Sequence, residues 1–440
     1  MKKSQKREPE FKGAITAFLA MIFVLMLSLV GALLESVSIQ MTKNRNRADT
    51  TLALESTFAE YDRQMLEEYD LFVRKECGES VLQKRLEYYG ADSMSHTLIR
   101  RELLTDQGGA AFREQAIRYV KNIYGLQELS LDTEYDFYSE TYLEEEELVY
   151  MDLEELLAQE ENTLPEENNP LVSVQRLKNT ELLTLLVDNP EELSNRSIEL
   201  SKLPSKRDIK KGNWDKQVLE EATDKVFLVA YLTEHFTKLG DEKQSKGLVY
   251  EQEYLLGGCS SDRENLEKAC KWILSIRMVA NYAYLLTDST KKAEAQALSM
   301  TLCSLLTVPG ITEVVKHAIL LGWAYGESIV DVRTLLKGKK VASVKSADTW
   351  QLQLANLVKL GTDKETVNEI NVPGGLDYQS YLTGLLAMQQ KEVLSMRSLD
   401  LIESNLQIKT DECMTKIEIK SKATLRRGVK DSFAMSFQYQ

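Results

Sequence analysis

The stretch from Ala14 to Leu34 holds twenty-one residues without a charged side chain, and it constrains the chain more than any other feature. As one helix it would measure about 31 Å, which matches the hydrocarbon core of a bilayer. No other part of the sequence has such a run. We therefore expect one membrane-spanning helix, anchored by these apolar side chains: Ala14, Phe18, Phe23, Leu27 and Leu34.

Basic residues flank this stretch unequally. Five Lys or Arg residues precede it, and three follow within the next twenty residues. The flank richer in Lys and Arg usually stays in the cytoplasm. We therefore expect a single-pass cell-membrane protein with a cytoplasmic basic tail, residues 1–13, and most of the chain outside the cytoplasm.

Two other interpretations of the apolar stretch remain open. A cleavable secretory signal usually has an apolar part of 7–15 residues that ends in a small-x-small site. The nearest such site is Val30-Gly31-Ala32, but Leu33 and Leu34 continue the apolar run beyond it. A buried helix of a soluble protein is the third interpretation. The length favours a retained anchor over residues 14–34.

Helix formers continue beyond the anchor, without Gly or Pro between Gly31 and Gly78. This composition predicts a helical stalk over residues 35–77. The polar run Thr42 to Arg47 and the pair Thr50-Thr51 are places where that helix could bend or stop. An apolar seam that includes Leu52, Leu66 and Tyr69 is the surface that we expect to contact a partner helix.

The formal net charge of −14 argues against a nucleic-acid partner. Much of the negative charge is local, since residues 122–175 contain sixteen acidic residues and no Lys or Arg. We expect a helical region over 78–161 that includes this acidic segment, with a Gly-rich break at Gln107 to Gly109. A solvated helix face accounts for the acidic run; calcium binding is the alternative, but the D-x-D-x-D-G loop pattern is absent.

Four prolines among polar residues predict a linker over 162–213, followed by a C-terminal domain over 214–440. We expect that domain to be mainly helical, with a capping box from Ser261 to Glu264 and a cap at Asp377. Alternating apolar residues over 413–425 and 433–439 predict a terminal β-hairpin. The predicted fold class is therefore mainly α (α+β). The expected elements are a strand or hairpin arm at 247–258 and helices at 214–239, 262–284, 291–307, 311–336, 347–360 and 378–406.

The sequence contains few residues in patterns typical of catalytic or metal-binding sites. His96, His235 and His317 are isolated, and we find no nucleophile, metal or phosphate-loop motif. Ser289 to Lys292 matches S-x-x-K but lacks companion elements. We therefore predict no catalytic residue, no metal site and no cofactor. Buried small hydrophobes or a single disulfide would each account for the scattered cysteines: Cys77, Cys259, Cys270, Cys303 and Cys413.

Aromatic and acidic side chains gather on one predicted helix at Trp323, Tyr325, Glu327 and Asp331. A buried aromatic and polar network between helices is one interpretation. A ligand site is the other.

The order of these features resembles the TadE/TadG-like proteins of tight-adherence (Tad) pilus and secretion loci, and the large domain resembles the uncharacterised Gram-positive branch of that group. The resemblance implies a structural or assembly part of an envelope machine and carries no catalytic residue. Related precursors usually have Glu five residues after the cleaved Gly, whereas Phe18 stands five after Gly13, which argues against processing there. The similarity rests on Glu60-Tyr61-Asp62, Tyr69 to Phe72, Glu253 to Gly258, Asn265-Leu266, Arg277 with Asn281, Trp323 to Ser328 with Asp331-Val332, Leu336 to Gly338, Trp350, and Tyr378 to Asn405.

We therefore expect a non-catalytic, membrane-anchored subunit of a Tad-type pilus or secretion apparatus. Its partners would be the membrane and other subunits, reached through the stalk and the exterior domain. The alternative is a cell-envelope module that binds or tethers a ligand, and an envelope hydrolase is a more distant third.

Overall fold

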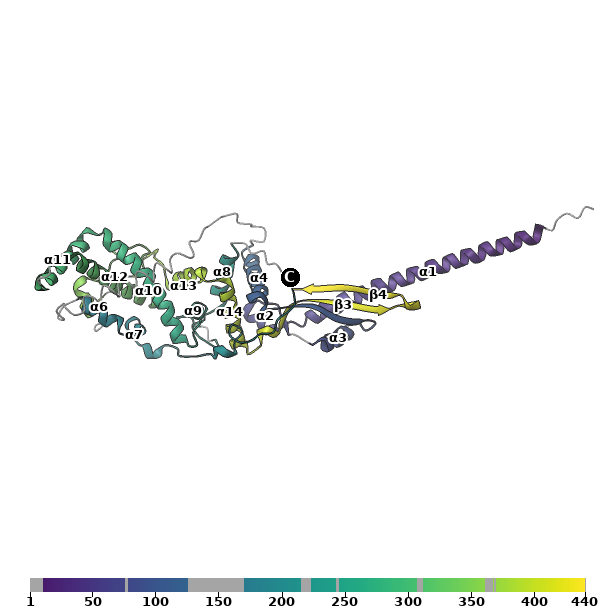
Figure 1. Ribbon diagram of the computed structural model, residues 1–440, viewed down its shortest axis with the longest axis horizontal. Helices are drawn as coiled ribbons and strands as arrows, with labels where there is room; N and C mark the ends of the chain where they lie inside the picture. The colour runs from purple at the N-terminus through teal and green to yellow at the C-terminus, as the bar shows by residue number, and fades with distance from the viewer. Residues whose placement is uncertain are drawn as a thin grey trace, which may run out of the picture.

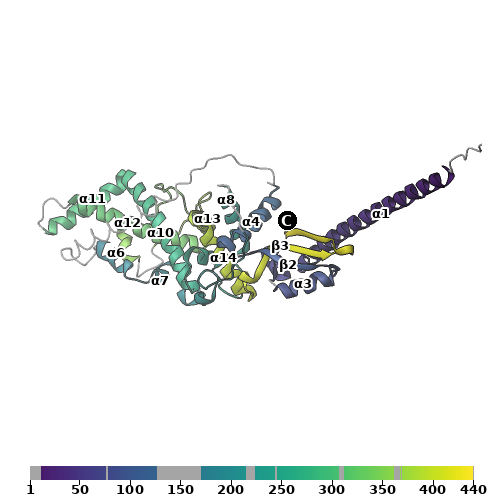
Figure 2. The same cartoon turned by 45° about the vertical axis from the view of Figure 1, so that its right-hand side comes forward.

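The computed structural model is elongated: one long helix extends from a neck, and the neck leads into a helical body (Figures 1 and 2). It describes residues 11–75, 78–125, 170–214, 223–242, 245–306, 312–360, 367 and 369–439. The basic tail before residue 11, most of the acidic segment and Cys77 lie outside these ranges. The long helix, α1, runs without interruption over Phe11–Phe58.

The neck is a four-stranded antiparallel sheet packed against the last part of α1. Strand β3 (Cys413–Thr424) is central; β2 (Ser95–Leu103) pairs along one edge of it, and β1 (Arg74–Lys75) and β4 (Lys430–Gln438) pair with it as well. The predicted hairpin is confirmed, with Ile417 opposite Phe437 and Ile419 opposite Met435. Helix α3 (Glu79–Tyr88) completes the layer. Their small shared core includes Leu54, Phe58, Leu82, Leu86, Ile417 and Ile419.

The body is mainly helical, as predicted, and its buried side chains form one contiguous core. Helix α12 (Thr312–Leu336) lies within this core and is buried almost continuously from Ala318 to Leu335. The other helices of the body are α2 (Arg63–Tyr69), α4 (Asp106–Ile123), α6 (Pro170–Lys178), α7 (Leu182–Leu186), α8 (Asp224–His235), α9 (Glu251–Gly257), α10 (Asp262–Thr287), α11 (Ser289–Leu306), α13 (Tyr378–Met388) and α14 (Lys391–Leu406).

Two predicted helix starts are confirmed in detail. Ser261 and Glu264 form a reciprocal capping box at the start of α10, and the Asp377 side chain accepts from the backbone N–H of Ser380 at the start of α13. The Gly-rich break is present too: Gln107, Gly108 and Gly109 have positive φ inside α4. A Cβ on Gly109 would lie 2.9 Å from the Ser395 Cβ, so glycine lets α4 approach α14 closely.

The stalk is shorter than predicted. Helix α1 passes through Thr42 to Arg47 and Thr50-Thr51 but ends at Phe58, not near residue 77. A new helix, α2, begins directly after Asp62, whose carboxylate accepts from the backbone N–H groups of Gln64 and Met65. An Asp that caps a new helix turns the chain, because it satisfies backbone donors that a continuous helix would bond internally.

Residues 170–213 belong to the body and do not form the predicted linker. Helices α6 and α7 bury apolar side chains in the main core, and 3₁₀ turns η1 (Pro190–Glu192) and η2 (Leu200–Lys202) follow them. Pro170 begins α6 and Pro190 begins η1, which is a common place for proline in a helix. The buried side chains are Leu171, Val174, Leu177, Leu182, Leu183, Leu185 and Leu186.

Four element types differ from the sequence prediction. Residues 251–257 form a fully buried helix and no strand, since a short apolar run fits either. Residues 95–103 form β2, where we expected helix, because they pair with β3 more than 300 residues away. The helix predicted at 347–360 is only the 3₁₀ turn η3 (Leu354–Lys359). The helix predicted at 378–406 is two helices, α13 and α14, separated at Gln389 and Gln390.

Candidate functional site

The apolar part of α1 stands clear of the rest of the described chain. It is long and apolar enough to span a membrane, with a mean hydropathy of 2.7 and none of that window buried inside the protein. The predicted anchor residues Phe18, Phe23, Leu27 and Leu34 are exposed. The side chain of Ala14 lies outside the described set. A single-pass anchor therefore fits this helix.

The C-terminal hairpin lies along the next part of α1, and four contacts mark its path. The Phe437 ring stacks on Phe58 with centroids 4.5 Å apart. The Thr51 hydroxyl lies 3.2 Å from the Met435 sulfur, and the Arg47 guanidinium lies 5.6 Å from the centre of the Phe433 ring.

The fourth contact is an ion pair of 2.7 Å between Arg427 and Glu35. The four contacts thus run in the same order along both elements. On α1 they involve residues 58, 51, 47 and 35, and on the hairpin residues 437, 435, 433 and 427. Strand β4 and the turn before it therefore follow α1 down to the first residue after the apolar stretch.

The opposite face of α1 carries an apolar stripe, which we define as Val37, Met41, Ala48 and Leu52; all four are exposed. At about 100° per residue they fall within about 60° of one another around the helix axis. The part of α1 that packs in the neck, the neck helix, therefore has two different faces. The sheet of the neck covers one face, and no described residue covers the apolar face. The buried residues of the same segment are Asn46, Thr50, Ala53, Leu54 and Thr57.

The structure separates the three residues of the predicted stalk seam. Leu52 is 60% exposed on α1, whereas Leu66 is half-buried on α2 and Tyr69 is only 3% exposed. The Tyr69 hydroxyl accepts a hydrogen bond of 2.9 Å from the Asn405 amide inside the body. Of the three, Leu52 alone remains available for a partner helix, and it belongs to the apolar stripe.

Glu327 and Asp331 lie on α12 and share one cation. The Lys345 ammonium donates to Glu327 at 2.5 Å and to Asp331 at 2.7 Å. On the other side, the Arg277 guanidinium of α10 donates to Asp331 at 2.9 Å. These four side chains, the buried ionic cluster, are nearly completely excluded from solvent. Two acids and two bases balance, which lowers the cost of burying charge.

Electrostatics in the cluster follow from burial and pairing. Burial raises the pKa of the Glu327 carboxyl, while Lys345 opposes that rise. Burial alone would lower the pKa of the Arg277 guanidinium, but Asp331 raises it above its usual value. The backbone N–H groups of Gln351 and Leu352 also donate to Glu327, at 3.0 and 2.6 Å. The cluster therefore fastens the loop after α12 to α10 and α12.

Lys345 is not among the site residues predicted from the sequence. Two carboxylates on an otherwise apolar helix require a nearby cation if they are buried. Four lysines follow α12 between residues 337 and 345, so the signal was present, but only the folded loop shows which lysine returns to the cluster.

Trp323 contributes to packing on the same helix. Its indole N–H donates to the Leu352 carbonyl oxygen at 2.8 Å, and the Trp350 indole donates to the same oxygen at 2.7 Å. The two rings meet edge to face with centroids 5.6 Å apart, and the Lys291 ammonium lies 5.0 Å from the Trp323 ring centre. These contacts fit the interpretation of an aromatic and polar network.

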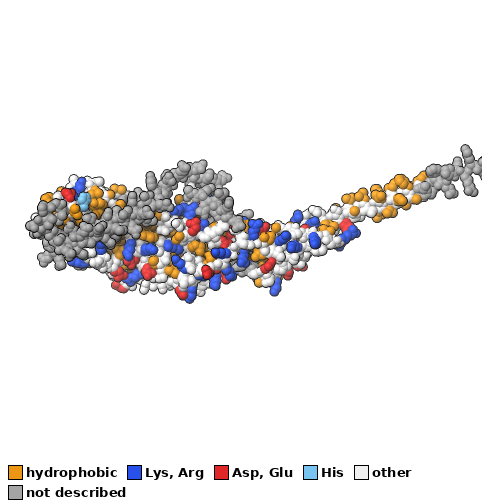
Figure 3. Space-filling view, in the orientation of Figure 1, with side chains coloured by type: hydrophobic (Ala, Val, Ile, Leu, Met, Phe, Trp, Pro, Cys, Tyr) orange, Lys and Arg blue, Asp and Glu red, His pale blue; other side chains and the backbone are white. Residues whose placement is uncertain are grey.

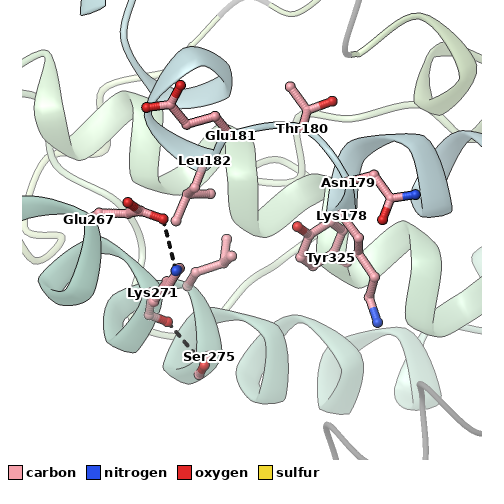
Figure 4. A pocket seen from close by; sticks show the side chains of 10 residues that line it. Lys178, Asn179, Thr180, Glu181, Leu182, Glu267, Lys271, Ser275 and Tyr325 are labelled. Atoms are coloured by element: carbon pink, nitrogen blue, oxygen red, sulfur yellow. Dashed lines mark hydrogen bonds and ion pairs between the residues drawn. The ribbon is translucent and has the colours of Figure 1, made fainter. Parts of the chain in front are cut away.

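Tyr325 points elsewhere, into a surface pocket of about 400 Å³ between the α6–α7 connection and α10 (Figure 4). Lys271 pairs with Glu267 at 2.8 Å at its edge, and the Ser275 hydroxyl donates to the Lys271 carbonyl oxygen at 3.0 Å. Lys178 lies on the opposite wall. The pocket is polar and of mixed charge, so its lining favours no single class of ligand.

A second group of buried polar residues lies on α9, where the sequence suggested only a strand. Glu251 accepts from Asn405 at 2.6 Å and from the backbone N–H of Thr237 at 2.8 Å. Glu253 accepts from the Tyr378 hydroxyl at 2.9 Å. Burial raises the pKa of Glu253 to about 7. These carboxylates join α8, α9, α13 and α14, and their place in a fully buried helix gave no signal in the sequence.

The remaining candidates have ordinary structural positions. Cys259, Cys270, Cys303 and Cys413 are free thiols. His235 contacts Asp70 at 3.1 Å, and the exposed Ser289 begins α11. Within the described ranges, no group of three or more His, Cys, Asp or Glu side chains could hold a metal ion.

Comparison with known proteins gives one match. A family model described as a family of unknown function (DUF5702) matches residues 160–425, which is more than half of the chain. The chain therefore belongs to this family. No curated protein and no solved structure matches it.

Proposed function

We propose that this member of the DUF5702 family is a non-catalytic structural or assembly subunit of an envelope apparatus of the Tad pilus or secretion type. In this proposal α1 crosses the cell membrane once, with the N-terminus in the cytoplasm and the body outside. The observation that carries the proposal is the two-faced neck helix, whose covered face is fixed to the protein's own sheet while its apolar stripe is exposed.

The stripe has the geometry of a helix-packing surface. Successive members are separated by four, seven and four residues, so they return to one face of the helix, as the apolar residues of a helix-packing face do. The same face of the helix continues into the apolar stretch at Phe23, Leu27, Val30 and Leu34, which are separated by four, three and four residues. A partner helix could therefore follow α1 from the membrane into the neck.

The rigid neck supports the same function. The hairpin and α3 cover one side of α1, so a load on the body is passed to the membrane helix through packed side chains and not through a flexible linker. An assembly subunit needs a fixed position and a complementary surface. The resemblance to TadE/TadG-like proteins is the reason for assigning this subunit to a Tad-type pilus or secretion apparatus.

A ligand-binding module is the competing proposal, and the pocket beside Tyr325 is its best location. Trp323, Glu327 and Asp331 do not line that pocket, and their polar atoms are engaged within the protein. A ligand that raises the melting temperature of the protein, and loses that effect in Tyr325→Ala and Lys271→Ala, would favour this alternative.

Gene replacement tests the assembly function. We expect deletion of the gene to abolish or alter pilus display or secretion, and we expect Met41→Asp combined with Leu52→Asp to reproduce the deletion while the protein stays folded in the membrane. A charge on the stripe would have to be buried without a partner on assembly. Gln40→Asp is the matched control, since Gln40 is exposed but lies about 90° from the centre of the stripe. Normal assembly by the double variant would contradict the proposal.

A further inference from the structure

The tip of the C-terminal hairpin reaches the end of the apolar stretch. The tip is a tight turn, closed by a hydrogen bond of 2.8 Å from the Leu425 N–H to the Val429 carbonyl oxygen. Arg427 in this turn pairs with Glu35, the first residue after Leu34. Figure 1 shows the yellow hairpin lying along α1 and ending partway along it. If residues 14–34 span the hydrocarbon core, the turn lies at the level of the lipid headgroups.

Positive charge is concentrated along the end of the hairpin that leads to this tip. Residues 420–431 contain five basic side chains and one acidic side chain, in a chain whose formal net charge is −14. All five basic side chains are exposed, whereas the single acid, Asp431, is buried. In Figure 3 blue side chains lie at the end of the neck, next to the orange part of α1. We call these five residues the basic tip: Lys420, Lys422, Arg426, Arg427 and Lys430.

The ion pair with Glu35 accounts for only part of this charge. Arg427 remains 78% exposed in its pair. Arg426 lies within the turn and Lys430 directly follows it, and both are exposed. Farther along α1, fourteen residues beyond Glu35, Asp49 pairs with Arg45 at 3.5 Å. The balance at this level of the protein is therefore positive and faces the place where α1 leaves the apolar stretch.

We propose that the basic tip binds the headgroups of anionic phospholipids in the leaflet from which the neck emerges. The hairpin then holds the membrane at a second point beside α1, which fixes the tilt of the body relative to the membrane plane. Phosphate is the group that a cluster of Arg and Lys recognises best at a membrane surface. The inference requires α1 to span the bilayer but does not depend on the assembly function proposed above.

The test uses the full chain in detergent and counts bound lipid molecules by native mass spectrometry. We expect phosphatidylglycerol to bind at least tenfold more tightly than phosphatidylcholine, and we expect that preference to weaken with rising salt. Arg426→Ala with Lys430→Ala should weaken phosphatidylglycerol binding by roughly 25-fold, since each basic residue near an anionic surface contributes about fivefold. Added glycerol phosphate should not compete, because it lacks the acyl chains that hold a phospholipid beside α1; competition would assign the site to a free phosphate compound and overturn the proposal.

Two further variants distinguish binding at the basic tip from a general effect of net charge. Lys206→Ala with Lys211→Ala removes the same charge from exposed positions on the body and should leave lipid binding unchanged. Glu35→Gln breaks the ion pair but keeps the basic tip, so phosphatidylglycerol binding should be kept or strengthened. Equal binding of the two lipids by the unaltered protein would overturn the proposal. An equal loss in the body variant, or loss of lipid preference in Glu35→Gln, would also overturn it.

Discussion

The Tyr439 hydroxyl donates a hydrogen bond of 2.7 Å to the backbone carbonyl oxygen of Phe58, where α1 ends. The two rings also meet edge to face, with centroids 5.4 Å apart. Tyr439, which follows β4, is therefore fixed to the end of α1, 381 positions away in the sequence. This contact makes α1 and the hairpin a single packed unit.

Removal of that hydroxyl should weaken the neck. We expect Tyr439→Phe to lower the free energy of unfolding by about 1–2 kcal/mol, because a buried carbonyl oxygen loses its donor. Tyr88→Phe is the control, since Tyr88 is 77% exposed, and it should change stability by less than about 0.5 kcal/mol. Chemical denaturation of the purified protein measures both; equal effects would contradict the prediction.

The buried ionic cluster should depend on its shared cation. Lys345→Met leaves Glu327 and Asp331 with one base between them, and we expect a loss of about 3–5 kcal/mol. Lys339→Met, which breaks a partly exposed pair of 3.7 Å with Glu369, should cost less than about 1 kcal/mol. The loss in Lys345→Met should shrink at acid pH, where a carboxyl can take up a proton. A small, pH-independent loss would show that the cluster does not need Lys345.

Glu253 should make stability depend on pH. Burial raises its pKa from 4.5 to about 7, so its contribution to stability is fully present below about pH 4.5 and is lost as the pH rises through about 7. The change corresponds to about 3 kcal/mol at about 1.36 kcal/mol for each pKa unit. Glu253→Gln should therefore become more stable relative to the unaltered protein between pH 5 and pH 8. Glu294→Gln, on an exposed position of α11, should show no such trend.

Helix α7 should be essential to the body. Leu183 is completely buried in the main core, so Leu183→Ala should lower the free energy of unfolding by about 2–5 kcal/mol through lost burial and the cavity it leaves. The exposed Glu191 nearby gives the control, Glu191→Ala. If Leu183→Ala had no effect, residues 170–213 would behave as the linker that the sequence suggested.

The sequence predicted well what depends on local pattern. The apolar stretch, the capping box at Ser261, the cap at Asp377 and the alternating hairpin strands each follow from spacing within a few residues, and the structure has them all. The mainly helical class follows from the same patterns. These features need no knowledge of distant parts of the chain.

Long-range contacts account for what the sequence could not predict. Strand β2 contains few apolar residues. It forms a strand because β3 provides hydrogen-bond partners for its backbone. Pro170 and Pro190 of the expected linker begin α6 and the 3₁₀ turn η1, because α6 and α7 have a core to pack against. Tyr69 is not part of a stalk seam, because Asp62 caps a new helix, α2, that contains Tyr69. In the sequence Lys345 cannot be distinguished from other loop lysines, and only the fold places it beside two buried acids.

Cross-linking in native membranes tests the central claim most directly. A photoreactive amino acid at Met41 or Leu52, on the apolar stripe, should capture a single-pass helical subunit. We expect the gene of that subunit to lie beside this gene and beside a gene for a secretion ATPase. The same amino acid at Gln40, off the stripe, should capture much less of that subunit. Mass spectrometry identifies the product. If positions 41 and 52 capture only lipid, or the same proteins as position 40, then the stripe is not a partner surface and the assembly function is contradicted.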